Sequence, residues 1–308
     1  MGPQIRRRPE RSLRLDWRLN VQDLERPLAR KNRSMSADSK PRELAEPSEL
    51  ALGVESYEQA GFWRPGESMS DHERGRVVQT LSHLPKDIDS LLDIGCGDGK
   101  IAHVLSELGR GPSPVQLDFS QKALELCRGP RVRAQVDRLP FADRAFDACI
   151  AAEVLEHLPT DILERTAKEM CRVARRYVFV TVPYLEFLPE HDVRCEHCSQ
   201  IFNAWGHLHS FDEARLLGLF EGLRPRRVEA FGPDRTDYPG ALLYLRQRLG
   251  GQWLRWDLSF CPACRQQVKS SGEGNLVARG CDFLYHRMQR WLKAKPTWLM
   301  GLFERPQS

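Results

Sequence analysis

Short apolar runs alternate with amphipathic stretches along the middle of the chain. The runs that read as buried strands lie at residues 90–95, 113–120, 131–137, 176–183 and 226–232, and another opens the segment 146–158. Stretches with apolar residues at helical spacing lie between them, at 72–84, 100–108, 121–128, 163–174 and 211–223. Such an alternation predicts an α/β fold, with a mostly parallel sheet covered by helices on both faces.

The alternation fails at both ends of the chain and once in the middle. Residues 1–48 are rich in Arg, Pro, Ser and Lys and are expected to form a disordered basic arm. We therefore expect the α/β domain at residues 49–235, starting with a helix within 55–63. A polar insertion rich in His, Cys and aromatic residues, 184–210, follows the fifth strand, and a C-terminal segment, 236–308, follows the domain.

Composition indicates the class of protein and its cellular location. Of its 308 residues, 41% are hydrophobic and 29% are charged, with a net charge of +4, which is typical of a globular protein and makes nucleic acid an unlikely partner. The sequence has no apolar run long enough to span a bilayer, and its first residues lack the core of an export signal. A cytoplasmic location is expected, and there paired cysteines favour a metal over disulfides.

A glycine-rich turn follows the first strand. Asp93, Gly95, Gly97 and Gly99 form the pattern D-x-G-x-G-x-G between this strand and a helix. The glycines let the backbone turn sharply and approach a ligand, and the helix offers free N–H groups. Asp118 ends the next strand, where a carboxylate can accept both hydroxyls of a ribose. The pattern differs from the dinucleotide fingerprint G-x-G-x-x-G, because the third glycine comes too early.

Four segments taken in order resemble successive motifs of class I S-adenosylmethionine-dependent methyltransferases. They are 91–100, 117–124, 136–159 and 177–183. The resemblance covers about residues 70–235 and is greatest to the broad subgroup that includes quinone-biosynthesis methyltransferases. It implies a Rossmann-like, seven-stranded, mostly parallel sheet, S-adenosylmethionine as the cofactor, and methyl transfer as the reaction.

The resemblance also implies which residues hold the cofactor. Asp93 would orient its methionine part, with Gly95 and Gly97 beneath it, and Asp118 would hold the ribose hydroxyls, with Phe119 beside the adenine. Gly99 completes the cofactor-binding glycine motif. The other residues that the resemblance assigns to the cofactor are Asp137, Arg138 and Leu139 around the adenine, and Glu153 at the methionine part or the substrate mouth.

Methyl transfer from a sulfonium is an in-line displacement, so alignment supplies most of the catalysis. A base is needed only for a hydroxyl or a protonated amine. His157 is the first candidate, together with Glu153, although a histidine at this position also serves helix packing or capping. The other candidates follow the fifth strand, at Tyr184, His191, His207 and His209.

Two C-x₂-C pairs predict a metal site. Cys195, Cys198, Cys261 and Cys264 can bind a tetrahedral zinc ion, each pair forming one knuckle. Because residues 199–260 separate the pairs, folded structure must lie between them. His191, His197, His207 or His209 could replace one cysteine. Four thiolates leave no open position on zinc, so we expect a structural site that shapes the acceptor side of the domain. The other cysteines are expected to be packing residues.

The C-terminal segment contains an amphipathic stretch. Leu284, Tyr285, Met288, Trp291 and Leu292 fall on one predicted helical face, close to three basic residues. The helix either docks on the domain or makes a peripheral contact with an anionic membrane.

The sequence is compatible with three functions. The favoured one is a methyltransferase that acts on an O or N atom of a small-molecule, glycan or lipid-linked acceptor. The others are a methyltransferase that acts on protein or RNA and uses the zinc module for docking, and a non-catalytic binding module. The sequence leaves the acceptor and the oligomeric state undetermined.

Overall fold

The structure is a computed structural model that describes residues 57–58, 63, 69–254, 260–268 and 274–306. Contacts divide the chain into residues 1–43 and 44–308, and every described residue belongs to the second unit. The expected basic arm, 1–48, lies outside the described residues, as does most of the expected helix within 55–63.

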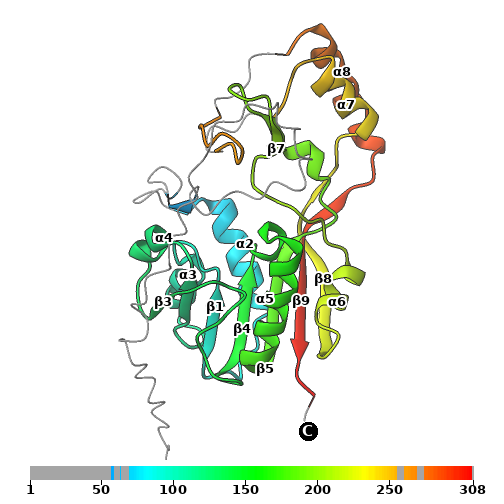
Figure 1. The fold of residues 1–308 in the computed structure, drawn as a ribbon. Helices are drawn as coiled ribbons and strands as arrows, with labels where there is room; N and C mark the ends of the chain where they lie inside the picture. The colour runs from blue at the N-terminus through cyan, green and yellow to red at the C-terminus, as the bar shows by residue number, and fades with distance from the viewer. Residues whose placement is uncertain (1–56, 59–62, 64–68, 255–259, 269–273, 307–308) are drawn as a thin grey trace, which may run out of the picture. The chain divides into compact units, whose positions relative to one another are not determined.

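A seven-stranded sheet forms the centre of the described unit (Figure 1). Its strands are β1 (Leu91–Ile94), β2 (Val115–Asp118), β3 (Arg131–Arg133), β4 (Phe146–Ala152), β5 (Ala174–Pro183), β8 (Arg224–Arg235) and β9 (Lys295–Glu304). Their order is β3-β2-β1-β4-β5-β9-β8. The first five are parallel, and β9 pairs antiparallel with both of its neighbours. The predicted Rossmann-like, mostly parallel sheet is confirmed.

The seventh strand comes from the end of the chain. β9 inserts between β5 and β8, so residues 295–304 complete the sheet. This strand lies outside the bounds expected for the domain, 49–235, and within the expected C-terminal segment, 236–308. Its side chains alternate between the two faces of the sheet: Leu299 and Phe303 join one core, while Trp298 and Met300 join the other. Burial on both faces explains why the central residues of the strand, 298–303, are apolar.

Two layers of helices cover the sheet, as predicted. α5 (Thr160–Val173) and α6 (Glu213–Leu219) pack on one face through Leu163, Met170 and Leu216. α2 (Asp71–Ser82) and α3 (Lys100–Leu108) pack on the other through apolar residues that include Leu81 and Val104. The short helix α4 (Gln121–Leu126) follows β2. All strands of the parallel part therefore end at one edge, where a ligand can bind.

The insertion and the C-terminal segment add further structure. The insertion contains the 3-10 turn η4 (Leu188–His191) and the hairpin of β6 (Asp192–Arg194) and β7 (Ile201–Asn203). Another 3-10 turn, η3 (Leu155–His157), follows β4. The C-terminal segment contributes α7 (Gly240–Arg248), α8 (Leu276–Met288) and η5 (Gln289–Trp291). Within the described part of the chain, no helix combines the length and the apolarity that a bilayer crossing requires.

The predicted amphipathic face of the tail is divided in the structure. α8 ends at Met288, so Trp291 lies in η5 and Leu292 follows it. Tyr285 stacks on Tyr238, with ring centroids 4.3 Å apart, and docks the helix. Leu284, Met288 and Trp291 are exposed. The five residues therefore do not share one helical face, because the helix is shorter than the sequence pattern suggested.

Candidate functional site

The glycine loop between β1 and α3 is held in a conformation that side chains would obstruct. Gly95 and Gly97 have φ angles of 68° and 54°, in the left-handed region. A Cβ atom on Gly95 would lie 2.6 Å from Cγ2 of Val154, which follows β4. The glycine is therefore required both for its backbone angle and for its close approach to the neighbouring strand end.

Asp118 connects this loop to the end of β2. Its Oδ2 accepts a hydrogen bond from the backbone N–H of Gly97 at 2.9 Å, and its Oδ1 accepts one from Ser120 at 2.8 Å. Burial raises the pKa of this carboxyl, although these backbone hydrogen bonds oppose the shift. Each carboxylate oxygen retains a lone pair for a ligand hydroxyl. The position fits the predicted contact with a ribose.

Asp93 is buried and lacks a hydrogen-bond partner on one oxygen. The side chain lies in β1 and is 1% exposed, and no described residue donates to its Oδ2. Burial, reinforced by the nearby charge of Asp118, raises the pKa of Asp93 to about 8. A buried acceptor without a donor costs free energy. A cationic amino group of a ligand would satisfy it.

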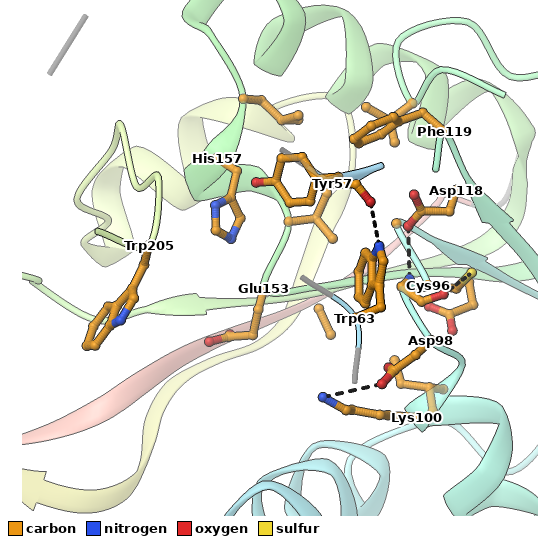
Figure 2. A pocket seen from close by; sticks show the side chains of 18 of the residues that line it. Tyr57, Trp63, Cys96, Asp98, Lys100, Asp118, Phe119, Glu153, His157 and Trp205 are labelled. Carbon is orange, nitrogen blue, oxygen red and sulfur yellow. Dashed lines mark hydrogen bonds and ion pairs between the residues drawn. The ribbon is translucent and has the colours of Figure 1, made fainter. Parts of the chain in front are cut away.

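A cavity of about 620 Å³ opens beside these residues. This volume is within the usual range for small-molecule sites. Figure 2 shows Asp118 and Phe119 on one side of the cavity and Glu153, His157 and Trp205 on the opposite side. We call the first side the glycine-loop end and the second the histidine end. The cavity therefore has two chemically different ends, each of which can bind a different part of its ligands.

Two aromatic residues that no sequence motif points to lie between the ends of the cavity (Figure 2). Tyr57 packs edge-on against Phe119, with centroids 5.3 Å apart, and Trp63 donates its indole N–H to the backbone oxygen of Tyr57 at 2.6 Å. A Cβ on Gly97 would lie 3.2 Å from the Trp63 ring. Both precede the glycine motif, within residues 55–63, where the sequence predicts a helix but no motif marks a binding site.

The wall after β3 differs from the expectation. Gln135 and Val136 line the cavity, whereas Asp137, Arg138 and Leu139 do not. Asp137 instead forms an ion pair with Arg165 of α5 at 3.0 Å. Arg138 is exposed, and Leu139 is 4% exposed within the core. Gly99 also lies outside the cavity wall: it caps α3, and a Cβ there would meet the side chain of Gln116 at 2.5 Å.

Glu153 and His157 reach the cavity from the segment that follows β4. Glu153 has a φ of 58°, an uncommon angle for a non-glycine residue, and its backbone N–H bonds to the oxygen of Thr181 in β5 at 2.9 Å. The Thr181 hydroxyl donates to Oε1 of Glu153 at 3.3 Å. Burial raises the pKa of the Glu153 carboxyl. Both predicted catalytic residues therefore line the cavity.

The other four predicted bases lie outside the cavity wall. The Tyr184 hydroxyl donates to Glu213 at 2.9 Å, and Nε2 of His209 lies 2.8 Å from the backbone oxygen of Leu158. His191 and His207 both contact Glu186, at 3.0 and 2.6 Å. These two histidines and Glu186 form a polar cluster, which contacts His157 through the ring of His207, with centroids 4.7 Å apart.

The four predicted cysteines come together in the structure. Sγ of Cys195 lies 3.5 Å from Sγ of Cys264, and Cys198 lies at the same distance from Cys261. All four sulfur atoms are within 4.8 Å of one another. A disulfide would require about 2.05 Å between sulfurs, so these are four free thiols. Sulfurs bound at about 2.3 Å to one tetrahedral zinc ion lie about 3.8 Å apart, which fits this arrangement.

The two cysteine pairs share one local geometry. The backbone N–H of Cys195 bonds to the oxygen of Gln200 at 2.8 Å, and that of Cys261 bonds to Gln266 at 2.9 Å. The residue after each pair has a φ of 61°; these residues are Ser199 and Arg265. Two matching knuckles that face each other are typical of a structural zinc site. Among the described residues, no histidine joins this group, so the four-cysteine set fits better than a set with a histidine.

Comparisons with known proteins agree with the sheet and the glycine loop. Residues 92–180 match the family described as "Methyltransferase domain". An uncharacterized methyltransferase of Mycobacterium leprae is 34% identical over 103 residues, which are 32% of this chain and 38% of the relative. An uncharacterized chloroplastic methyltransferase of Arabidopsis thaliana is 30% identical over 114 residues, 32% of each chain.

Similarity to solved structures is lower. A SAM-dependent methyltransferase from Archaeoglobus fulgidus is 16% identical, with a TM-score of 0.45, over 75% of this chain and 92% of the other. The match with the curated relatives spans less than half of their length. Residues 92–180 are therefore similar to a methyltransferase domain, and the match to the curated relatives extends over about a third of this chain.

Proposed function

We propose that the protein transfers a methyl group from S-adenosylmethionine to an O or N atom of a small-molecule, glycan or lipid-linked acceptor. One observation carries this proposal: a single cavity joins the glycine-loop end, with Asp93 and Asp118, to the histidine end, with Glu153 and His157. The first end suits a nucleoside with a cationic amino group. The second offers acid–base groups to an acceptor.

The cofactor would bind along the glycine-loop end. Asp118 would accept the ribose hydroxyls, Phe119 would lie beside the adenine, and Asp93 would accept from the amino group of the methionine part. Gln135 and Val136 replace the expected residues Asp137, Arg138 and Leu139 in the adenine wall. Bound S-adenosylmethionine supplies an electrophilic methyl group. The chain's own contribution is to position it and to exclude water around it.

A methylation screen tests the proposed acceptor class. The full chain is incubated with methyl-labelled cofactor and, separately, with metabolite extract, glycolipid extract, RNA and unfolded protein. Label in the first two pools is the expected result. Label confined to RNA or protein would favour a macromolecular acceptor, and cofactor binding without transfer to any pool would favour a non-catalytic module.

The cysteine cluster is proposed to hold a structural zinc ion through Cys195, Cys198, Cys261 and Cys264. These residues occupy a small core with Val193, Phe202 and Val268, and none of them lines the cavity. The ion would fasten the insertion to the C-terminal segment. Because the same insertion supplies Trp205 to the histidine end, the zinc site would shape the acceptor pocket without taking part in the reaction.

The exposed side of α8 is proposed as a peripheral membrane contact. Phe283 is 69% exposed and Trp291 is 67% exposed, close to Arg287 and Arg290. Apolar and basic side chains together suit the headgroup region of an anionic bilayer. Such a contact would bring a lipid-linked acceptor to the enzyme. Co-sedimentation with phosphatidylglycerol vesicles tests it.

A further inference from the structure

A second group of potential metal ligands lies at the histidine end of the cavity. One ligand atom each from Glu156, His157 and His207 lies within 4.8 Å of the other two. Glu156 and His157 come from η3, and His207 comes from the insertion. The insertion therefore completes a group that the methyltransferase domain begins. None of these residues belongs to the cysteine cluster.

Glu156 is buried without hydrogen-bond partners. It is 0% exposed, and no described residue donates a hydrogen bond to either carboxylate oxygen. The closest histidine nitrogen, Nε2 of His157, lies 3.8 Å from Oε1, which is too far for a hydrogen bond. An unpartnered buried carboxyl group is costly whether it is protonated or ionised. A cation at this point would supply what both oxygens lack.

The two histidines are suited to bind a cation. His157 is partly buried, with a side chain that is 25% exposed, and one of its ring nitrogens can coordinate an ion. Nδ1 of His207 lies 2.6 Å from Oε2 of Glu186, a carboxylate that is 5% exposed. If this nitrogen donates, Nε2 of His207 keeps its lone pair. Metal-binding histidines are commonly oriented by such a carboxylate.

The distances fit a single ion. Two atoms that each lie about 2.1 Å from one ion are at most about 4.2 Å apart, so the 3.8 Å between Glu156 and His157 is already suitable. The upper limit of 4.8 Å for the other pairs requires only small side-chain adjustments. Two imidazoles and one carboxylate form a ligand set for divalent Zn²⁺, Mn²⁺ or Fe²⁺. Three protein ligands leave at least one coordination position open.

We propose that Glu156, His157 and His207 bind a divalent metal ion whose open position takes a hydroxyl oxygen of the methyl acceptor. His157 lines the cavity, so the ion would face the acceptor. This inference rests on the proposed methyltransferase function and narrows the acceptor to an alcohol or phenol. It also gives His157 the role of a ligand in place of that of a base.

The reaction at this ion balances without a further reagent. The ion lowers the pKa of the acceptor hydroxyl, whose proton passes to solvent water. The resulting oxygen anion attacks the methyl carbon, and a new O–C bond forms. The S–C bond of the cofactor breaks with its electron pair going to sulfur, which leaves neutral S-adenosylhomocysteine.

Metal analysis and Mn²⁺ titration of the full chain test the site. Purified protein is incubated with Mn²⁺, desalted and analysed for all metals, and free Mn²⁺ is followed by electron paramagnetic resonance during titration. Mn²⁺ suits the oxygen and imidazole ligands and competes poorly for thiolates, so it reports on this site rather than on the cysteines. We expect two metal ions per chain, of which one is zinc in the cysteine cluster.

The variants Glu156→Gln and His207→Gln should each lose one metal ion per chain, or bind Mn²⁺ at least tenfold more weakly. The matched controls Glu164→Gln and His103→Gln change exposed residues and should behave as wild type. Wild-type protein that holds no metal beyond the cysteine zinc would overturn the proposal, as would unchanged binding in both variants.

Calorimetry with S-adenosylmethionine on the same preparations separates this proposal from the proposed function. Retained cofactor binding shows that a variant is folded, because neither Glu156 nor His207 lines the cavity. Cofactor binding without the second metal would overturn the metal site alone. Metal binding without cofactor binding would instead overturn the methyltransferase function and leave the site itself standing.

Discussion

The two ends of the cavity are built in different ways. The glycine-loop end comes from the ends of two adjacent strands, with Asp93, Gly95 and Gly97 from one segment and Asp118 from the next. The histidine end combines Glu153 and His157, after β4, with Trp205 from the insertion. Contiguous segments of adjacent strands form one end, and a distant insertion completes the other. We therefore expect the first to survive changes that disorganise the second.

The largest expected effect is on the glycine-loop end. Gly95→Ala adds a Cβ 2.6 Å from Val154 and strains a φ of 68°. We expect affinity for S-adenosylmethionine to fall by about 10- to 100-fold, which corresponds to about 1.4–2.7 kcal/mol. Isothermal titration calorimetry measures it.

Gly75→Ala is the matched control for this change. Gly75 lies in α2 with open space around its Cβ position, so alanine should leave cofactor affinity unchanged. If Gly95→Ala also bound the cofactor normally, the glycine loop would not form the cofactor site.

A cysteine variant should affect the histidine end selectively. We expect Cys198→Ser to lose the zinc ion and to destabilise the insertion by several kcal/mol, because a structural zinc site contributes directly to folding. Methyl transfer should fall at least tenfold, while cofactor affinity changes less than threefold. Metal analysis and hydrogen exchange of residues 192–203 measure these effects.

Cys171→Ser provides the control, since Cys171 is half-buried and outside the cysteine cluster. It should keep both zinc and activity. Loss of cofactor binding in Cys198→Ser would show that the two ends of the cavity are not independent.

The pKa of Asp93 makes the glycine-loop end sensitive to pH. With a pKa of about 8 in the folded protein and about 4 in the unfolded chain, the folded state retains a proton that the unfolded state releases. The free energy of unfolding of the cofactor-free protein should therefore fall as pH rises from about 4 to 8. Affinity for the cationic cofactor should rise over the upper part of this range, as Asp93 ionises.

Asp93→Asn removes this titration. The variant should be more stable than wild type at pH 8, by a few kcal/mol, and should bind the cofactor at least tenfold more weakly. Urea unfolding between pH 5 and 8 tests the first effect. Identical pH profiles for wild type and variant would show that Asp93 ionises normally, whereas the exposed-site control Asp234→Asn should keep the wild-type profile.

The smallest expected effect is at the exposed side of α8. Phe283→Ser and Trp291→Ser should change stability by less than about 0.5 kcal/mol, because both side chains are largely exposed. They should reduce co-sedimentation with anionic vesicles at least threefold. Unchanged sedimentation would rule out the proposed membrane contact. The proposals for the two ends of the cavity would not be affected by this result.

Sequence predicted the glycine-loop end better than the histidine end for a physical reason. Asp93, Gly95 and Asp118 lie at the ends of successive buried strands, so their proximity follows from strand pairing alone. Tyr57 and Trp63 reach the cavity from residues 55–63, which the sequence predicts only as a helix, and Trp205 reaches it from the insertion, where the alternation of strands and helices fails. Only tertiary packing brings them to it.

Two other differences have local causes. An ion pair with Arg165 turns Asp137 away from the cavity, so Gln135 and Val136 form the wall in its place. The apolar residues 298–303 could be recognised as buried, but their neighbours β5 and β8 come from other segments of the chain. The clustering of the four cysteines could be predicted because two C-x₂-C pairs form a recognisable ligand set for one ion, even with residues 199–260 between them.

Calorimetric titration of the full chain with S-adenosylmethionine tests the central claim most directly. We predict saturable binding of one cofactor per chain, weakened at least tenfold by Asp118→Asn, since Asp118 accepts hydrogen bonds from Gly97 and Ser120 and is the proposed acceptor for the ribose hydroxyls. The absence of saturable binding to the wild-type chain would contradict the account.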